Sequence, residues 1–216
     1  MTWDGPPLEA WDPWHPDEVA RRLSGVGVPW CVVGGFAIDL FLGRETRPHE
    51  DLEIVIARAD FARVRAHLAG FALHAVGDGE VRALAADELP PADKHQNWVL
   101  DPLANAWRMD VMLEPGDADT WIFRRDERIR AKRAQMVATT RDGIPYLGPQ
   151  GVLLYKAKNV RAKDERDFAA VVPQLGQPAR DWLREAIALA HPGHAWIAGL
   201  GQVRLSQTRH RSPLRR

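Results

Sequence analysis

The run VVGGFAIDLFLGRETRPHEDLEI, residues 32–54, decides the fold of this chain. It starts at the end of an apolar stretch, VPWCVV (residues 28–33), which is rich in β-branched residues and bounded by glycine, as expected for a buried strand. The glycine pair at 34–35 breaks that strand, and residues 36–42 then predict a helix. A polar loop leads into DLEIVI (residues 51–56), a second strand. The run therefore predicts a strand–helix–strand unit.

The chain outside this run predicts further strands and then a mostly helical C-terminal part. A helix opens at Pro16, where proline and acidic residues suit a first turn. The remaining predicted strands are 71–76, 80–86, 97–102 and 106–115, and the remaining predicted helices are 60–69, 148–172 and 179–190. Strands and helices in this order predict an α/β (α+β) fold with a mixed sheet.

The predicted elements change near residue 118, from the strand–helix core to extended segments followed by helices, and this suggests how the chain is divided. We expect a first domain over residues 1–118, and a strand-plus-helix region over 119–200 that completes a cleft. Residues 201–216 hold five arginines and no acidic residue, so we expect a disordered basic tail.

The composition is that of an ordinary globular protein without a charge bias. Apolar residues make up 45% and charged residues 27%, and 29 basic residues balance 29 acidic ones. No global field therefore points to a polyanionic partner. The single cysteine, Cys31, excludes an intrachain disulfide framework and a cysteine-based zinc site. Because the sequence has neither a signal peptide nor an apolar run of about 18 residues, we expect a cytoplasmic protein.

Two acidic residues are candidates for metal ligands. Strand alternation puts Asp51 and Glu53 on one face, with Cα atoms about 6–7 Å apart, so both side chains can reach one cation or a close pair. An isolated Asp-x-Glu is more often an exposed strand face. Gly34 and Gly35 change this balance, because free backbone N–H groups and a following helix N-terminus suit an anion. A phosphate cradle beside hard oxygen ligands predicts Mg²⁺ and a triphosphate.

Asp110 is a third acidic candidate. It is an acid within the apolar strand predicted at 106–115, where it shares a face with Arg108 and Met112. The alternative role for its carboxylate is an ion pair with Arg108 or another surface base.

The glycine pair followed by Asp-apolar-Glu-apolar resembles the signature of the DNA polymerase β-type nucleotidyltransferase superfamily. Within it, residues 30–57 look most like the aminoglycoside 2″-adenylyltransferases and the small lincosamide nucleotidyltransferases. Phe36 stands where those enzymes usually carry Trp, and Glu53 replaces the more usual second Asp. The positions that recur in register are Gly34, Gly35, Asp39, Gly43, Arg44, Arg47, His49, Asp51 and Glu53.

The resemblance implies a polymerase β-like fold and a Mg²⁺-dependent nucleotidyltransferase. The enzyme would move a nucleoside monophosphate, AMP from ATP or its equivalent from another nucleotide, onto a hydroxyl of a small molecule such as an aminoglycoside or lincosamide antibiotic. Asp51, Glu53 and Asp110 would be the catalytic residues and the ligands of a two-metal site, with Asp110 as ligand, general base or both. Gly34 and Gly35 would donate backbone N–H groups to the phosphates.

Five basic residues are candidates for contacts with the nucleotide: Arg44, Arg47, His49, Lys156 and Lys163. The first three lie in the loop before the acidic strand, where they would neutralise pyrophosphate, although Arg44 could equally pair with Asp39. Lys156 and Lys163 are seven apart on one predicted helix and near one face, within reach of a triphosphate. A solvated helix face is the more common reading of such a run.

Two other functions are compatible with the same residues. The basic run at 124–133 and the tail would suit a nucleic-acid acceptor such as a tRNA end, or the acceptor would be a protein. Neither basic run interleaves aromatic residues and the net charge is zero, which argues against a nucleic-acid groove. A nucleotide-binding antitoxin or regulatory module would keep the fold with reduced catalysis; three intact carboxylates disfavour it, but Glu53 in place of the second Asp keeps it open.

Overall fold

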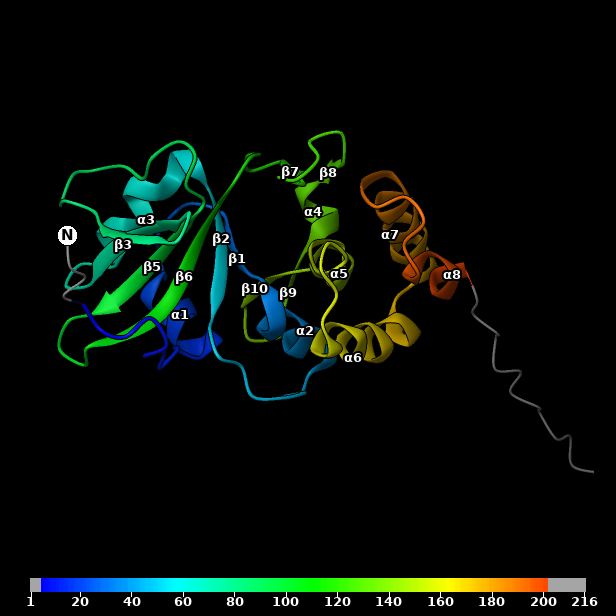
Figure 1. The fold of residues 1–216 in the computed structure, drawn as a ribbon, viewed down its shortest axis with the longest axis horizontal. Helices are drawn as coiled ribbons and strands as arrows, with labels where there is room; N and C mark the ends of the chain where they lie inside the picture. Colours follow the sequence, from blue (N-terminus) through cyan, green and yellow to red (C-terminus); the bar gives the residue numbers. More distant parts are fainter. Residues whose placement is uncertain (1–4, 202–216) are drawn as a thin grey trace, which may run out of the picture.

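A large mixed sheet crosses the molecule and a layer of C-terminal helices lies beside it in the computed structural model, which describes residues 5–201 (Figure 1). Within that range the sheet has eight strands in the order β4-β3-β5-β6-β2-β1-β10-β9. These strands are β1 (Trp30–Val32), β2 (Glu53–Ala57), β3 (Ala72–Gly77), β4 (Glu80–Ala83), β5 (Gln96–Asp101), β6 (Ala106–Glu114), β9 (Val137–Thr139) and β10 (Pro145–Leu147). A separate two-stranded sheet consists of β7 (Thr120–Ile122) and β8 (Arg130–Lys132).

The direction of the strands is mixed, as the sequence predicts. β2 pairs in parallel with β6, and β1 pairs in parallel with β10. The other neighbours in the large sheet run antiparallel, including the β3–β4 hairpin, whose turn holds Asp78 and Gly79 at positive φ.

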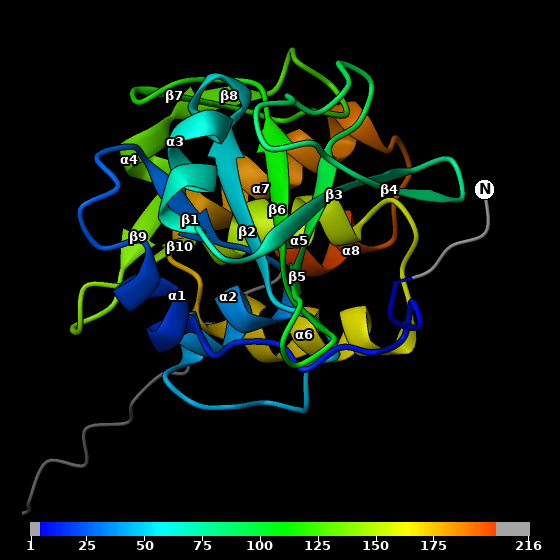
Figure 2. The ribbon, with the colours of Figure 1, turned by 90° about the vertical axis from the view of Figure 1, so that its left-hand side faces the viewer.

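The helices divide between the two halves of the chain. The helices of the first half are α1 (Pro16–Arg22), α2 (Gly34–Leu42) and α3 (Phe61–His67), and those after the large strands are α4 (Arg133–Met136), α5 (Pro149–Lys156), α6 (Ala162–Val171), α7 (Gln177–Ala190) and α8 (Trp196–Gly201). α5 packs against α6 and α7, and α7 against α8, so the C-terminal part is helical as predicted. Viewed from the sheet side, these helices lie behind the strands (Figure 2).

Alternation along the central strands separates an apolar face from a polar one. Ile54 of β2 and its register partner Val111 of β6 are fully buried in the main core. Their neighbours Glu53 and Asp110 project to the opposite face. We call the face that carries Glu53, Val55, Asp110, Met112 and Glu114 the cleft face of the sheet.

Three sequence-based expectations are modified by the structure. The glycine pair does not form a separate turn, because Gly34 is already the first residue of α2. The helix predicted over 148–172 is two helices, since α5 ends at Lys156 and a capping box between Arg161 and Asp164 starts α6. Lys156 and Lys163 therefore lie on different helices.

The expected division at residue 118 does not coincide with an edge of the sheet. β9 and β10 come from beyond that residue and complete the large sheet next to β1. The domain boundaries stay a prediction. The predicted basic tail at 201–216 lies outside the described residues, except for Gly201. Among residues 5–201, no helix combines the length and apolar character needed to span a membrane.

Candidate functional site

Two carboxylates lie side by side on the cleft face. The parallel register of β2 and β6 places Glu53 opposite Asp110, and adjacent strands are about 4.8 Å apart. The carboxylate of Asp110 accepts hydrogen bonds from the side-chain Nε2 of Gln96 at 2.8 Å and from the backbone N–H of Asn97 at 3.1 Å. It is therefore not paired with Arg108, whose guanidinium bonds Asp101 at 3.2 Å and Asp12.

Asp51 lies just before β2 and is exposed. Its charge still reaches the pair, because it contributes to the raised pKa values of both Glu53 and Asp110. Across residues 5–201, no three side chains of His, Cys, Asp or Glu are gathered closely enough to hold a metal ion as they stand. The structure thus brings Glu53 and Asp110 together and leaves the third predicted ligand, Asp51, just outside β2.

Ionising both Glu53 and Asp110 is electrostatically unfavourable without a cation. Burial, with the charges of Asp51 and Asp110, raises the pKa of Glu53 to about 8. Burial also raises the pKa of Asp110 to about 7, against the hydrogen bonds from Gln96 and Asn97, and Asp51 adds to the rise. Adjacent carboxylates that repel one another and offer only oxygen donors suit a hard divalent cation. The chemistry of the donor set fits Mg²⁺.

The glycine pair sets the position of these acids. Gly34 has φ +64°, and a Cβ built on it would overlap a carboxylate oxygen of Glu53. At Gly35 an added Cβ would overlap the ring of His49, and it would lie 2.7 Å from Nη2 of Arg47. No side chain caps the N-terminus of α2, so the N–H groups of its first turn are open to an anion.

The loop that carries the other predicted residues is held by Asp39. Oδ1 of this carboxylate accepts from the Thr46 backbone N–H at 3.1 Å and from its hydroxyl at 2.5 Å, and Oδ2 lies 2.6 Å from Nε2 of His49. The His49 ring packs against Phe36 with centroids 4.4 Å apart. The ion pair of Asp39 is therefore with His49 and not with the exposed Arg44, which was the alternative.

A chain of charges connects this loop to α6. Arg47 Nη1 lies 3.0 Å from Nδ1 of His49, and its Nη2 lies 3.6 Å from Oδ2 of Asp167. Lys156 lies between two buried carboxylates, with Nζ 2.7 Å from Asp164 and 2.9 Å from Asp167. Burial opposes ionisation of Asp164, but its hydrogen bonds from Arg161 and Lys156 prevail and lower its pKa to about 2.

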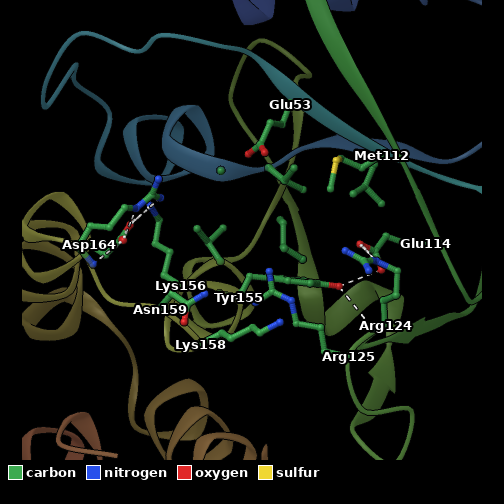
Figure 3. Close-up of a pocket in the computed structure, with 16 residues that line it drawn as sticks. Glu53, Met112, Glu114, Arg124, Arg125, Tyr155, Lys156, Lys158, Asn159 and Asp164 are labelled. Carbon is green, nitrogen blue, oxygen red and sulfur yellow. Dashed lines mark hydrogen bonds and ion pairs between the residues drawn. The ribbon is translucent and has the colours of Figure 1, made fainter. Parts of the chain in front are cut away.

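A cavity of about 450 Å³ opens between the cleft face and α5; we call it the larger cavity (Figure 3). It contains five basic side chains, which makes it suitable for a polyphosphate. Its walls are Val33, Gly34, Glu53, Val55, Met112, Glu114, Arg124, Arg125, Leu147, Val152, Tyr155, Lys156, Lys158, Asn159, Arg161 and Asp164.

Only some of the predicted site residues line this cavity. Gly34, Glu53 and Lys156 do. Lys163 pairs instead with the exposed Glu50, at 3.5 Å. The other predicted residues that are not in the wall are Gly35, Arg44, Arg47, His49, Asp51 and Asp110.

Sequence reasoning missed the wall formed by Glu114, Arg124, Arg125 and Tyr155. The Tyr155 hydroxyl donates to Oε2 of Glu114 at 2.9 Å, and Nε of Arg124 donates to Oε1 at 3.3 Å (Figure 3). One signal for Glu114 was available, because strand alternation places it on the same face as Asp110. The two arginines were visible only as part of a basic run.

Residues 17–98 match a family model described as aminoglycoside-2''-adenylyltransferase. Over these residues the chain is similar to this family, and the chain is a nucleotidyltransferase. The match includes the glycine pair, the Asp39 loop, Asp51 and Glu53, whereas Asp110 and the larger cavity's later residues lie beyond it. No curated protein matches the chain.

Three solved structures are similar to this nucleotidyltransferase. A crystal structure of ANT(2")-Ia in complex with adenylyl-2"-tobramycin has a TM-score of 0.49 and 12% identity, with 80% of this chain and 95% of that one covered. The solution structure of ANT(2'')-Ia has a TM-score of 0.47 and 16% identity, with 80% and 89% covered. An antigenic nucleotidyltransferase-like protein from Paracoccidioides brasiliensis has a TM-score of 0.45 and 15% identity, with 85% and 89% covered.

Gly34→Ala is expected to remove activity, because its new methyl group displaces the Glu53 carboxylate. Gly43→Ala is a matched control: Gly43 has φ +66°, close to the +64° of Gly34, but a Cβ there meets nothing within 4 Å. Each variant should lose about 1–2 kcal/mol of unfolding free energy through backbone strain. Denaturant unfolding and pyrophosphate release measure the two effects, and equal activity in the two variants would contradict the role of Gly34.

Glu53→Gln is expected to stabilise the metal-free protein at alkaline pH. The folded state holds a proton on Glu53 up to a pKa of about 8, above the ordinary value of 4.5. The free energy of unfolding of the wild type therefore falls as pH rises between these values, because the unfolded chain releases that proton first. The Tm of the variant should exceed that of the wild type at about pH 8.5 and approach it near about pH 5.

Thermal melts in EDTA measure this difference, and Mg²⁺ should raise the Tm of the wild type but not that of the variant. The same pH dependence in both proteins would contradict the electrostatic account of Glu53.

Proposed function

We propose that this nucleotidyltransferase transfers AMP from ATP to a hydroxyl group of a small molecule, with an aminoglycoside as the first candidate acceptor. The observation that carries the proposal is the in-register pair Glu53 and Asp110, of which Glu53 lines, together with Gly34 of α2, a cavity with five basic side chains. The family of residues 17–98 supports the choice of acceptor.

The donor side follows from the larger cavity. Gly34 brings the backbone of α2 to the phosphates, and Lys156, fixed by Asp164 and Asp167, presents its ammonium group to the triphosphate. Glu53 and Asp51, with Asp110, would hold Mg²⁺, which supplies charge neutralisation for the phosphates. Arg47 and His49 act behind Gly35 as positioning residues for this loop, because their side chains bind protein groups.

The acceptor side follows from Asp110. Its pKa of about 7 suits a general base near neutral pH, and Gln96 and Asn97 orient its carboxylate. Asp110 takes the proton of the acceptor hydroxyl, and that oxygen attacks the α-phosphorus. The bond from phosphorus to the bridging oxygen breaks, and pyrophosphate leaves along the basic wall of the larger cavity.

The basic run at 124–133 gives little support to a nucleic-acid acceptor. Arg124 and Arg125 line the larger cavity, and Arg128 bonds its neighbour Asp126 at 2.6 Å. A small acceptor within the cleft therefore explains these residues better than a long polyanion on the surface.

Purified protein with ATP, Mg²⁺ and an aminoglycoside is expected to release pyrophosphate and to form an acceptor adduct of AMP mass. Asp110→Asn should lower kcat by about 10²–10⁴-fold, because a general base is lost, and Glu53→Gln should remove turnover. Glu80→Gln, an exposed acid on β4, is the control and should leave the rate unchanged.

Mass spectrometry of aminoglycosides, lincosamides, simple alcohols and tRNA after incubation with a nucleotide mixture identifies donor and acceptor together. An adduct on tRNA alone, or full activity in Asp110→Asn, would overturn the proposal.

A further inference from the structure

A second cavity of about 310 Å³, the smaller cavity, adjoins the first. It opens toward the β3–β4 turn and the segment 93–96, on the opposite side of Glu53 from α5. The two cavities share four wall residues: Glu53, Met112, Arg124 and Arg125. A group at this shared wall therefore touches both spaces.

Each cavity has a distinct chemistry beyond the shared wall. The larger one carries Lys156, Lys158 and Arg161, which suit a polyphosphate. The smaller one is lined by Gln96, whose amide donates to Asp110 at 2.8 Å, so the proposed base lies directly behind this wall residue. Its rim carries two exposed acids, Asp78 and Asp93, which both pair with Lys94; the distance from Lys94 Nζ to Asp93 is 3.5 Å.

The two shared arginines are fixed by one tyrosine. Arg124 bonds Glu114 through Nε at 3.3 Å, and Glu114 is in turn held by the Tyr155 hydroxyl at 2.9 Å. Nη1 of Arg125 donates to the carbonyl of Tyr155 at 2.6 Å, and its guanidinium lies 5.1 Å from the centre of the Tyr155 ring. Figure 3 shows both side chains beside Tyr155. Their positions are therefore set before any ligand binds.

The charge of Arg125 at this wall is open to an anion. Glu114, which is 6% exposed, bonds Arg124, whereas Arg125 donates to a carbonyl oxygen. The other acid of the shared wall, Glu53, has a pKa raised to about 8 by burial and by Asp51 and Asp110. Partial burial and the neighbouring Arg124 lower the pKa of Arg125, the direction expected where positive charges are crowded.

We infer that Arg124 and Arg125 contact the phosphate that is transferred, with the nucleotide in the larger cavity and the acceptor hydroxyl in the smaller one. This assignment rests on the proposed function. As the acceptor oxygen bonds to the α-phosphorus and the bond to pyrophosphate breaks, negative charge grows on the phosphate oxygens. Guanidinium groups that are already in place beside the phosphate stabilise this negative charge without reorganisation. The proton of the hydroxyl goes to Asp110.

The test compares Arg124→Ala and Arg125→Ala with Arg128→Ala, an arginine of the same loop that lies outside both cavities and pairs with Asp126. Arg124→Ala should lower kcat by about 10²-fold or more, as expected for loss of a group that acts in the transition state. Arg125→Ala should lower kcat less, and Arg128→Ala should retain it. Guanidinium ion at millimolar concentration should restore part of the rate of Arg124→Ala.

Arg124→Lys covers the case in which the alanine variant does not fold, because it keeps a charge near Glu114. It should fold and still lose kcat, since lysine cannot bond Glu114 and a phosphate in the same fork geometry. Wild-type kcat in Arg124→Lys and Arg125→Ala, or a loss of rate without rescue by guanidinium in a folded Arg124→Ala, would overturn the inference.

A separate measurement, of KM for the acceptor and for ATP, tests which substrate each cavity binds. Asp93→Asn should raise KM for an amine-bearing acceptor and leave KM for ATP unchanged, whereas Lys158→Gln should do the reverse. Effects in the opposite direction would overturn the assignment. If the wild type forms no adduct with any nucleotide and acceptor, the proposed function fails; if it does and the arginine variants keep their rate, this inference alone fails.

Discussion

Glu53 and Asp110 lie side by side because β2 and β6 pair in parallel with these two residues in register. The register itself is fixed by the apolar residues between them: Ile54 and Val111 are fully buried, and a slip of one residue would move them to the open face. The core therefore holds together two carboxylates whose repulsion would otherwise separate them. Their raised pKa values are the electrostatic consequence of that constraint.

The N-terminal and C-terminal halves are coupled through ion pairs at the same site. Asp39 fixes His49, Arg47 reaches Asp167, and Asp167 shares Lys156 with Asp164. These charges are mostly buried, so loss of one partner leaves another unsatisfied, which typically costs about 3–5 kcal/mol. The side chains of Arg47 and His49, which the sequence motif assigns to the nucleotide, thus bind protein groups around the glycine pair.

Tyr155 has an equivalent role on the other side of Glu53. It belongs to α5, yet it orders two arginines that follow β7 and a glutamate at the end of β6. Burial and the adjacent Glu114 carboxylate raise the pKa of this phenol, so it remains a hydrogen-bond donor. Two cavities meet at this wall because residues from three distant segments converge on one face of the sheet.

The sequence alone determined the strand–helix–strand unit, the glycine pair between the first strand and Asp51 and Glu53, and the position of Asp110 on a strand. These follow from local periodicity, from glycine conformations and from a motif with fixed spacing. Only the tertiary structure decided that Glu53 faces Asp110, that Lys156 and Lys163 separate onto two helices, and that Arg124 and Arg125 enter the cleft. Strand register, helix packing and long-range ion pairs bring together residues that are far apart in the chain. A local sequence pattern does not predict such contacts.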